Sequence, residues 1–154
     1  MISLKHTFEE AARHALKNKE PFLLQTLRLA LAALHNREIE KRGKTGSNEL
    51  AEEEIVAVLR AEAKKRRDAA AEFEKGGRKD LSEKELREAA ILEKYLPVQL
   101  PDEEIEKIVR EVIGQSGGAT PKNFGTIMGE TMKRLRGQAS GERVKDIVDR
   151  LLKG

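Results

Sequence analysis

The stretch YLPVQLPDEE, residues 95–104, divides the sequence into two parts and decides its fold. Two prolines, Pro97 and Pro101, force an extended link, because proline lacks an amide hydrogen and keeps the residue before it out of the helical region. The three acidic residues that follow suit the first turn of a new helix, where the helix dipole favours negative charge. The stretch therefore predicts a boundary between a domain of residues 1–97 and a domain of residues 98–154.

The composition favours helices built on small aliphatic side chains. Of the 154 residues, 37% are charged and only 3% are aromatic, and the chain contains no cysteine. A bias toward Leu, Ala, Glu, Lys and Arg is typical of helical proteins. The lack of cysteine excludes disulfides and thiolate zinc sites, and it fits a reducing compartment. The net charge of +3 permits an anionic partner without requiring one.

Upstream of the prolines, apolar residues recur with helical period and do not alternate as they would in a strand. The predicted helices run from a cap at Ser3 to Lys17, from Pro21 to Gly43, from Ala51 to Gly76, and from Leu81, capped by Asp80 or Ser82, to Leu96. On the first helix, Phe8 and either Ala15 or Leu16 are expected to face the core. Residues 1–97 are therefore expected to form a four-helix domain.

Downstream of the prolines, three short apolar stripes predict three short helices. They consist of Ile105, Ile108, Val109, Val112 and Ile113; of Phe124, Ile127, Met128 and Leu135; and of Val144, Ile147, Val148, Leu151 and Leu152. Thr120 as cap and Pro121 in the first turn are expected to open the middle helix, and Ser140 to cap the last. The predicted fold class is all-α, with an N-terminal four-helix domain followed by a small C-terminal three-helix domain.

The middle helix of this small domain carries an unusual face. When its residues are projected at 100° per residue, Lys122, Lys133 and Arg136 fall together, and Gly125 and Gly129 lie within the same side. Each glycine inside a helix costs about 1 kcal/mol relative to alanine, so these two require a compensating advantage. They leave the backbone bare between cations, where a bulky partner could approach closely.

The positive charge is concentrated in the same part of the chain. From Lys122 onward there are eight Lys and Arg residues and four Asp and Glu residues, a net charge of +4. The backbone N–H groups of Gly141, Glu142 and Arg143 open the last helix and form a second potential anion site. A phosphate backbone is the polyanion that such a surface suits. The alternative is that the glycines admit a neighbouring helix of the same chain, and that the charges only keep a small domain soluble.

The residues in this region match a known family. FGTIMGETMKRLRGQASGERVKDIV, residues 124–148, closely resembles the GatB/YqeY domain, and the segments FEKGGRKDL and ILEKYLPVQL are similar to small bacterial YqeY-like proteins. The resemblance covers essentially the whole chain and implies a helical N-terminal domain followed by a compact helical C-terminal domain. Pro101 and Ala51 stand where the family often has a Ser or Thr cap, and Ser140 stands where Asp is common. These departures concern local stability more than function.

The second domain also resembles the tail of the B subunit of glutamine-dependent tRNA amidotransferases, carbon–nitrogen ligases that use glutamine as amido donor. In those enzymes the tail contacts the outer corner of tRNA, while other domains and subunits perform the chemistry. The resemblance therefore implies a cytoplasmic, non-catalytic tRNA-binding accessory protein. The predicted RNA-binding residues are Lys122, Gly125, Gly129, Lys133, Arg134, Arg136, Ser140, Gly141, Arg143 and Lys145.

Two other functions stay open at this point. In the first, the glycine face docks a helix of an amidotransferase subunit or of another tRNA enzyme. In the second, the chain is itself a catalytic component of an amidotransferase. The sequence offers no catalytic residue, metal site or cofactor site for the second, since it has no cysteine and no phosphate-binding glycine loop. His6 and His14 share a helix face but lie about 12 Å apart along it, too far for one zinc ion.

Two further features have plain interpretations. The run AKKRRD, residues 63–68, points around more than half of a helix, so a solvated face with Lys64–Asp68 and Glu62–Arg66 pairs is expected. No membrane partner is expected, because the most apolar run, residues 22–34, is short and contains Gln25, Thr26 and Arg28. The first ten residues have no long apolar segment, so no signal peptide is expected.

Overall fold

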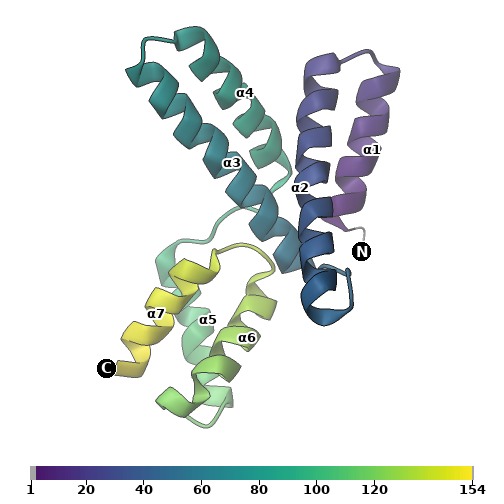
Figure 1. Cartoon of the computed structure of the whole chain (residues 1–154). Coiled ribbons are helices and arrows are strands. Elements are labelled where there is room, and N and C mark those ends of the chain that lie inside the picture. Colours follow the sequence, from purple (N-terminus) through teal and green to yellow (C-terminus); the bar gives the residue numbers. More distant parts are fainter. Residues whose placement is uncertain (1–2, 154) are drawn as a thin grey trace. The chain divides into compact units, whose positions relative to one another are not determined.

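The computed structural model describes residues 3–153, which form seven α-helices and one short 3₁₀ helix (Figure 1). The described residues include no strand, so the all-α prediction is confirmed. The chain divides into two compact units, one ending at Leu96 and the other beginning at Pro97.

The N-terminal unit consists of two helical hairpins (Figure 1). Its helices are α1 (Leu4–Lys17), α2 (Pro21–Thr45), α3 (Glu52–Lys75) and α4 (Lys79–Tyr95). Each helix contributes an aliphatic or aromatic side chain to one core, which includes the fully buried Phe8, Leu27, Leu34, Leu59 and Leu92. The ring of Tyr95 packs 4.9 Å from that of Phe8, so the end of α4 is fixed to α1.

The start of α1 follows the prediction, but its inward face is narrower than expected. The Ser3 hydroxyl accepts a hydrogen bond from the His6 amide at 3.2 Å, which confirms the predicted cap. Phe8 and Ala15 are buried. Leu16 is 59% exposed, so of the two alternatives only Ala15 faces the core.

The predicted end of α2 is wrong, because the helix continues through Gly43 to Thr45 and ends at Gly46, which has a φ of 81°. The two further residues form bonds of their own. The Thr45 hydroxyl donates to the Lys41 carbonyl at 3.0 Å, and the Lys44 ammonium lies 3.2 Å from the Glu40 carboxylate. One glycine near an exposed helix end costs little against these bonds.

The predicted start of α4 is also wrong, since the helix begins at Lys79 and neither candidate residue caps it. Asp80 lies inside the first turn, and its carboxylate binds the Arg78 guanidinium at 3.1 Å. Ser82 is buried in the helix at 4% exposure. The acidic residue still suits this position, because it lies at the positive end of the helix dipole.

The basic run on α3 contains a buried ion pair that the sequence did not reveal. The predicted pairs are confirmed, with Lys64 at 2.9 Å from Asp68 and Arg66 at 3.0 Å from Glu62. Arg66, however, is only 8% exposed, and its Nε lies 3.1 Å from the buried Glu88 carboxylate of α4. The expectation of a solvated face therefore fails at Arg66, which ties α3 to α4.

We expect the Arg66→Ala variant to lower the free energy of unfolding by about 2–3 kcal/mol, because it leaves Glu88 buried with a weakened set of partners. Lys84 remains 3.7 Å from Glu88, which limits the loss. The neighbouring Lys65 has a side chain that is 75% exposed, so Lys65→Ala should cost less than about 0.5 kcal/mol. Urea unfolding of both variants measures these changes. Equal losses in the free energy of unfolding would show that the buried Arg66–Glu88 pair stabilises the fold no more than an exposed pair does.

The C-terminal unit is a bundle of three short helices. They are α5 (Asp102–Gln115), α6 (Phe124–Leu135) and α7 (Gly141–Lys153), and each packs against the other two. Ser140 caps α7 as predicted, with its hydroxyl accepting from the Arg143 amide at 3.3 Å. Thr120 and Pro121 open a 3₁₀ turn, Pro121–Asn123, and α6 proper begins only at Phe124. The predicted opening of the middle helix is thus displaced by one short turn.

One polar atom in the core of this unit has no partner. Thr131 on α6 is fully buried at 0% exposure, and its hydroxyl makes no hydrogen bond. A buried hydroxyl that has lost its bonds to water without gaining others destabilises the folded state.

The Thr131→Val variant should therefore raise the free energy of unfolding by about 1 kcal/mol, because valine has nearly the same shape and needs no partner. Thr126→Val on the exposed part of the same helix is the matched control and should change stability by less than about 0.5 kcal/mol. Chemical unfolding of both proteins measures the difference. A Thr131→Val protein less stable than wild type would mean that the hydroxyl is satisfied in solution.

Candidate nucleic-acid interface

The predicted glycine face of α6 is open. Gly125, Gly129 and Lys133 follow one another at four-residue spacing, and all three are exposed. A Cβ atom added at Gly125 or Gly129 would meet no atom of another part of the chain within 4 Å. No described residue covers this strip of main chain, so the glycines do not serve close packing with a neighbouring helix of the same unit.

Four of the predicted cations have exposed side chains, Lys122, Lys133, Arg136 and Lys145. Only Lys133 lies in α6 itself. The predicted projection onto one helix is wrong for Lys122 and Arg136, because Lys122 lies in the 3₁₀ turn before α6 and Arg136 ends the helix with left-handed backbone, and Lys145 lies on α7. None of these four side chains has a hydrogen-bond or ion-pair partner within residues 3–153. We call Gly125, Gly129 and these four cations the glycine–cation face. An anion that approached it would not have to displace an acidic side chain first.

The other two predicted cations, Arg134 and Arg143, are held by the protein. Arg134 donates to the Gln115 side chain and lies 3.6 Å from the carboxylates of Glu111 and Glu130. The Arg143 guanidinium binds Asp102 at 2.6 Å, and its N–H groups are directed to residues before α5. The structure therefore separates the predicted cations into four free and two engaged.

The turn after α6 contains two consecutive residues with left-handed backbone. Gly137 has a φ of 83° and is buried, and this left-handed conformation is common for a glycine just after a helix. Arg136 has a φ of 47°, a conformation that costs a residue with a side chain about 1 kcal/mol. Non-glycine residues in this region cluster at functional sites, because elsewhere selection removes the strain.

The N-terminus of α7 offers less than the sequence suggested. The Arg143 amide is used by the Ser140 hydroxyl, so it is not free for an anion. Gly141 is exposed, and the space beside it is open. Of the predicted residues here, Ser140 has a structural role as cap, and Gly141 is accessible.

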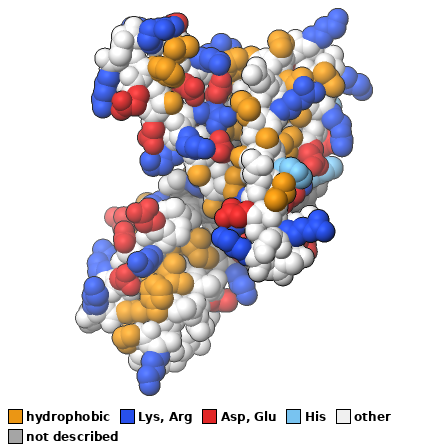
Figure 2. Space-filling view, in the orientation of Figure 1, with side chains coloured by type: hydrophobic (Ala, Val, Ile, Leu, Met, Phe, Trp, Pro, Cys, Tyr) orange, Lys and Arg blue, Asp and Glu red, His pale blue; other side chains and the backbone are white. Residues whose placement is uncertain are grey.

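Charge is unevenly distributed over the C-terminal unit. Figure 2 shows hydrophobic side chains in the middle of one face of this unit, with Lys and Arg along its margins and acidic side chains at one end. The acids of α5 also engage cations of the last helix, since Glu106 lies 2.8 Å from Arg150. The hydrogen bond from Arg110 holds the pKa of Glu106 below its usual value, with Arg150 adding to the effect.

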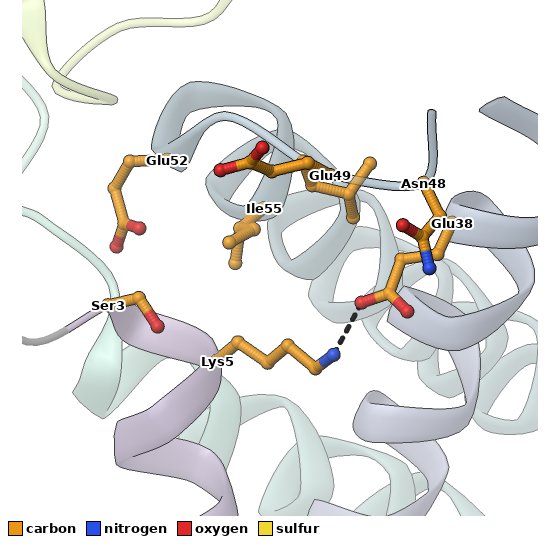
Figure 3. A pocket seen from close by; sticks show the side chains of 8 residues that line it. Ser3, Lys5, Glu38, Asn48, Glu49, Glu52 and Ile55 are labelled. Atoms are coloured by element: carbon orange, nitrogen blue, oxygen red, sulfur yellow. Dashed lines mark hydrogen bonds and ion pairs between the residues drawn. The ribbon is translucent and has the colours of Figure 1, made fainter. Parts of the chain in front are cut away.

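A separate pocket lies in the N-terminal unit, between the start of α1 and the loop after α2 (Figure 3). Three glutamates, Glu38, Glu49 and Glu52, line it together with Lys5. Lys5 binds Glu38 at 2.5 Å, and Glu52 accepts the Leu4 amide at 2.7 Å. The charged groups thus serve mainly to fix the start of α1. Among the described residues, no cluster of His, Asp and Glu is arranged to hold a metal ion.

The partners of Arg143 were missed by sequence reasoning. Gln99, Leu100 and Asp102 precede Arg143 by 44, 43 and 41 residues. No local spacing rule connects positions so far apart. The sequence offered one weak signal, because an acidic first turn of one helix and an arginine in the first turn of another occur in the same small unit.

These features define an all-helical protein whose second unit exposes bare helix backbone among unpaired cations. The chain belongs to the family described as Yqey-like protein, whose sequence profile matches residues 5–152. The resemblance noted from the sequence is confirmed over nearly the whole chain. A comparison with curated proteins gives no match. Within residues 3–153, no helix is long and apolar enough to cross a membrane.

The open surroundings of Gly129 lead to a stability prediction. Gly129→Ala should raise the free energy of unfolding by up to about 1 kcal/mol, because alanine is the better helix former and its methyl group meets nothing. Gly137→Ala is the contrasting control and should be destabilising, since its φ of 83° strains any side chain. Urea unfolding of both variants measures the effects. A less stable Gly129→Ala protein would mean that this glycine contributes to packing after all.

Proposed function

We propose that this protein is a non-catalytic accessory protein that binds cytoplasmic tRNA through the glycine–cation face of its C-terminal unit. The observation that carries the proposal is the combination of uncovered backbone at Gly125 and Gly129 with four cations that have no protein partner within residues 3–153. Both features reduce the stability of a free protein, through helix propensity and charge repulsion. Both become favourable when a polyanion lies against the helix.

The chemistry of the face suits the phosphate backbone better than the bases. Only 3% of the residues are aromatic, which leaves little for the stacking that single-stranded bases require. Lysine and arginine contacts to phosphates give affinity and position with little reading of sequence. The similarity of the C-terminal sequence to the tail of the tRNA amidotransferase B subunit makes folded tRNA the favoured target.

The proposal assigns different roles to the predicted site residues. Phosphates are contacted by Lys122, Lys133, Arg136 and Lys145, while the glycines let the RNA backbone approach the helix. Gly141 offers a backbone amide at the start of α7. Arg134, Arg143 and Ser140 support the surface through bonds within the protein, because their polar groups already have protein partners.

The charge of the face can be reversed without touching the core. We expect the double variant Lys133→Glu/Arg136→Glu to bind a fluorescein-labelled tRNA at least about tenfold more weakly than wild type, because two phosphate contacts become repulsions. For wild type, the plot of log affinity against log salt concentration should have a slope of about −3 to −4, as four contacts predict. Fluorescence anisotropy titrations at several salt concentrations measure both quantities.

A matched control tests whether location matters rather than net charge. Lys79→Glu/Lys94→Glu changes the same number of exposed lysine or arginine positions, but on α4 of the N-terminal unit. This control should retain nearly full affinity. Equal binding by wild type and Lys133→Glu/Arg136→Glu would remove the C-terminal site from the proposal.

A second candidate function is the docking of a partner helix, for example from an amidotransferase subunit. One observation favours it: Met128 and Met132 are only partly buried, on the same helix as the open glycines. Methionine surfaces beside small residues accept apolar helices readily. Capture of one protein that survives both nuclease treatment and high salt would favour docking, whereas loss of the captured material under either treatment favours tRNA.

A further inference from the structure

Arg143 connects three parts of the C-terminal unit through one guanidinium group. Its Nη1 donates to the Gln99 side chain at 3.0 Å, and its Nη2 donates to the Leu100 carbonyl at 2.8 Å. Nε and Nη2 both bind one carboxylate oxygen of Asp102, at 3.2 and 2.6 Å. All three nitrogens of the Arg143 guanidinium therefore donate to residues 99–102. Such a planar set of bonds fixes direction as well as distance.

The segment that Arg143 holds is itself bonded to the turn after α6. The Leu100 amide donates to the Gln138 carbonyl at 2.8 Å. Gln138 follows the two left-handed residues, Arg136 and Gly137, and its own amide donates to the Leu135 carbonyl at 3.0 Å. A chain of hydrogen bonds thus runs from Arg143 through Leu100 to the turn that carries Arg136.

We infer that Arg143 is a positioning residue for the glycine–cation face. It holds residues 99–102 against the turn after α6 and so fixes where Arg136 presents its charge. This inference rests on the proposed function, in which Arg136 contacts phosphate. Arg143 would then affect tRNA binding by holding this segment in place and not by binding phosphate itself, because its guanidinium already forms an ion pair with Asp102.

Removal of the Asp102 carboxylate should change the affinity for tRNA in opposite directions under the two explanations, net charge and positioning of Arg143. Asp102 is a negative group with a side chain that is 70% exposed, so its removal should strengthen binding of a polyanion if charge alone mattered. If Asp102 instead holds Arg143 in place, Asp102→Ala should weaken tRNA binding, by roughly three- to tenfold. The two expectations cannot both be met.

Glu103→Ala provides the matched control. Glu103 lies in the same first turn of α5, is exposed and has no partner among the described residues. The substitution removes the same charge at the same end of the helix, but it leaves Arg143 untouched. It should leave the affinity for tRNA unchanged or raise it slightly.

The experiment titrates a fluorescein-labelled tRNA with the full chain as wild type, Asp102→Ala, Glu103→Ala, Arg143→Lys, Arg143→Ala and the double variant Asp102→Ala/Arg143→Ala. Arg143→Lys should bind as weakly as Arg143→Ala, since lysine keeps the charge but loses the fork. The double variant should bind no more weakly than Arg143→Ala, because both residues act through one network. Asp102→Ala that binds as tightly as Glu103→Ala, or rescue by Arg143→Lys, would overturn the inference.

Hydrogen exchange at the Leu100 amide gives a readout that does not depend on RNA. Exchange should accelerate in Asp102→Ala and in both Arg143 variants but not in Glu103→Ala, because only the former release residues 99–102 from the turn. Unchanged protection in the former variants would overturn the inference even if tRNA binds. If wild type binds no tRNA, the proposed function fails, while the exchange data still decide whether the hydrogen-bond chain exists.

Discussion

A twelve-residue helix in a three-helix bundle can bury only one stripe of side chains, and this constraint governs the C-terminal unit. On α6 the buried stripe consists of Ile127, Thr131 and Leu135. The opposite side cannot contribute to the core, so its residues are free to serve another purpose. That side carries Lys133 and the two glycines, Gly125 and Gly129, which pack against no other part of the chain and lower the stability of the helix. Core and surface are thus separated within one short helix, and the surface can be altered while the fold is kept.

The C-terminal unit is small, and the glycines and unpaired cations on its surface lower its stability. Residues outside its three helices therefore have to help stabilise it. The segment after Pro97 supplies part of this stabilisation. Leu100 packs against the core and donates its amide to Gln138, while Arg143 binds the residues on either side of Pro101, Leu100 and Asp102. The link between the two units is therefore partly a structural component of the second one. The same bonds fix the turn after α6, where Arg136 adopts a left-handed backbone.

Local rules predicted much of this from the sequence, and they failed where distant residues decide. Proline and serine signals placed the starts of α2 and α7 correctly, since both act within one turn of the helix. Gly43 did not end α2, because bonds from Lys44 and Thr45 back to Glu40 and Lys41 offset the low helix propensity of one glycine. Helical periodicity placed Gly125, Gly129 and Lys133 on one side of α6, but it left open whether another helix covers the glycines, and only the structure shows that the space beside them is open. The engagement of Arg143 by Gln99 and Asp102, and of Arg66 by Glu88, depends on tertiary packing that no local spacing reveals.

The central claim is that nucleic acid lies directly against the bare main chain of α6. The most direct test is a titration of the ¹⁵N-labelled full chain with unlabelled tRNA, followed through the backbone amide signals. The account predicts that the signals of Gly125 and Gly129 shift or broaden first and recover when salt is added. Binding of tRNA that leaves both glycine signals unchanged, with the perturbed residues elsewhere in the chain, would contradict it.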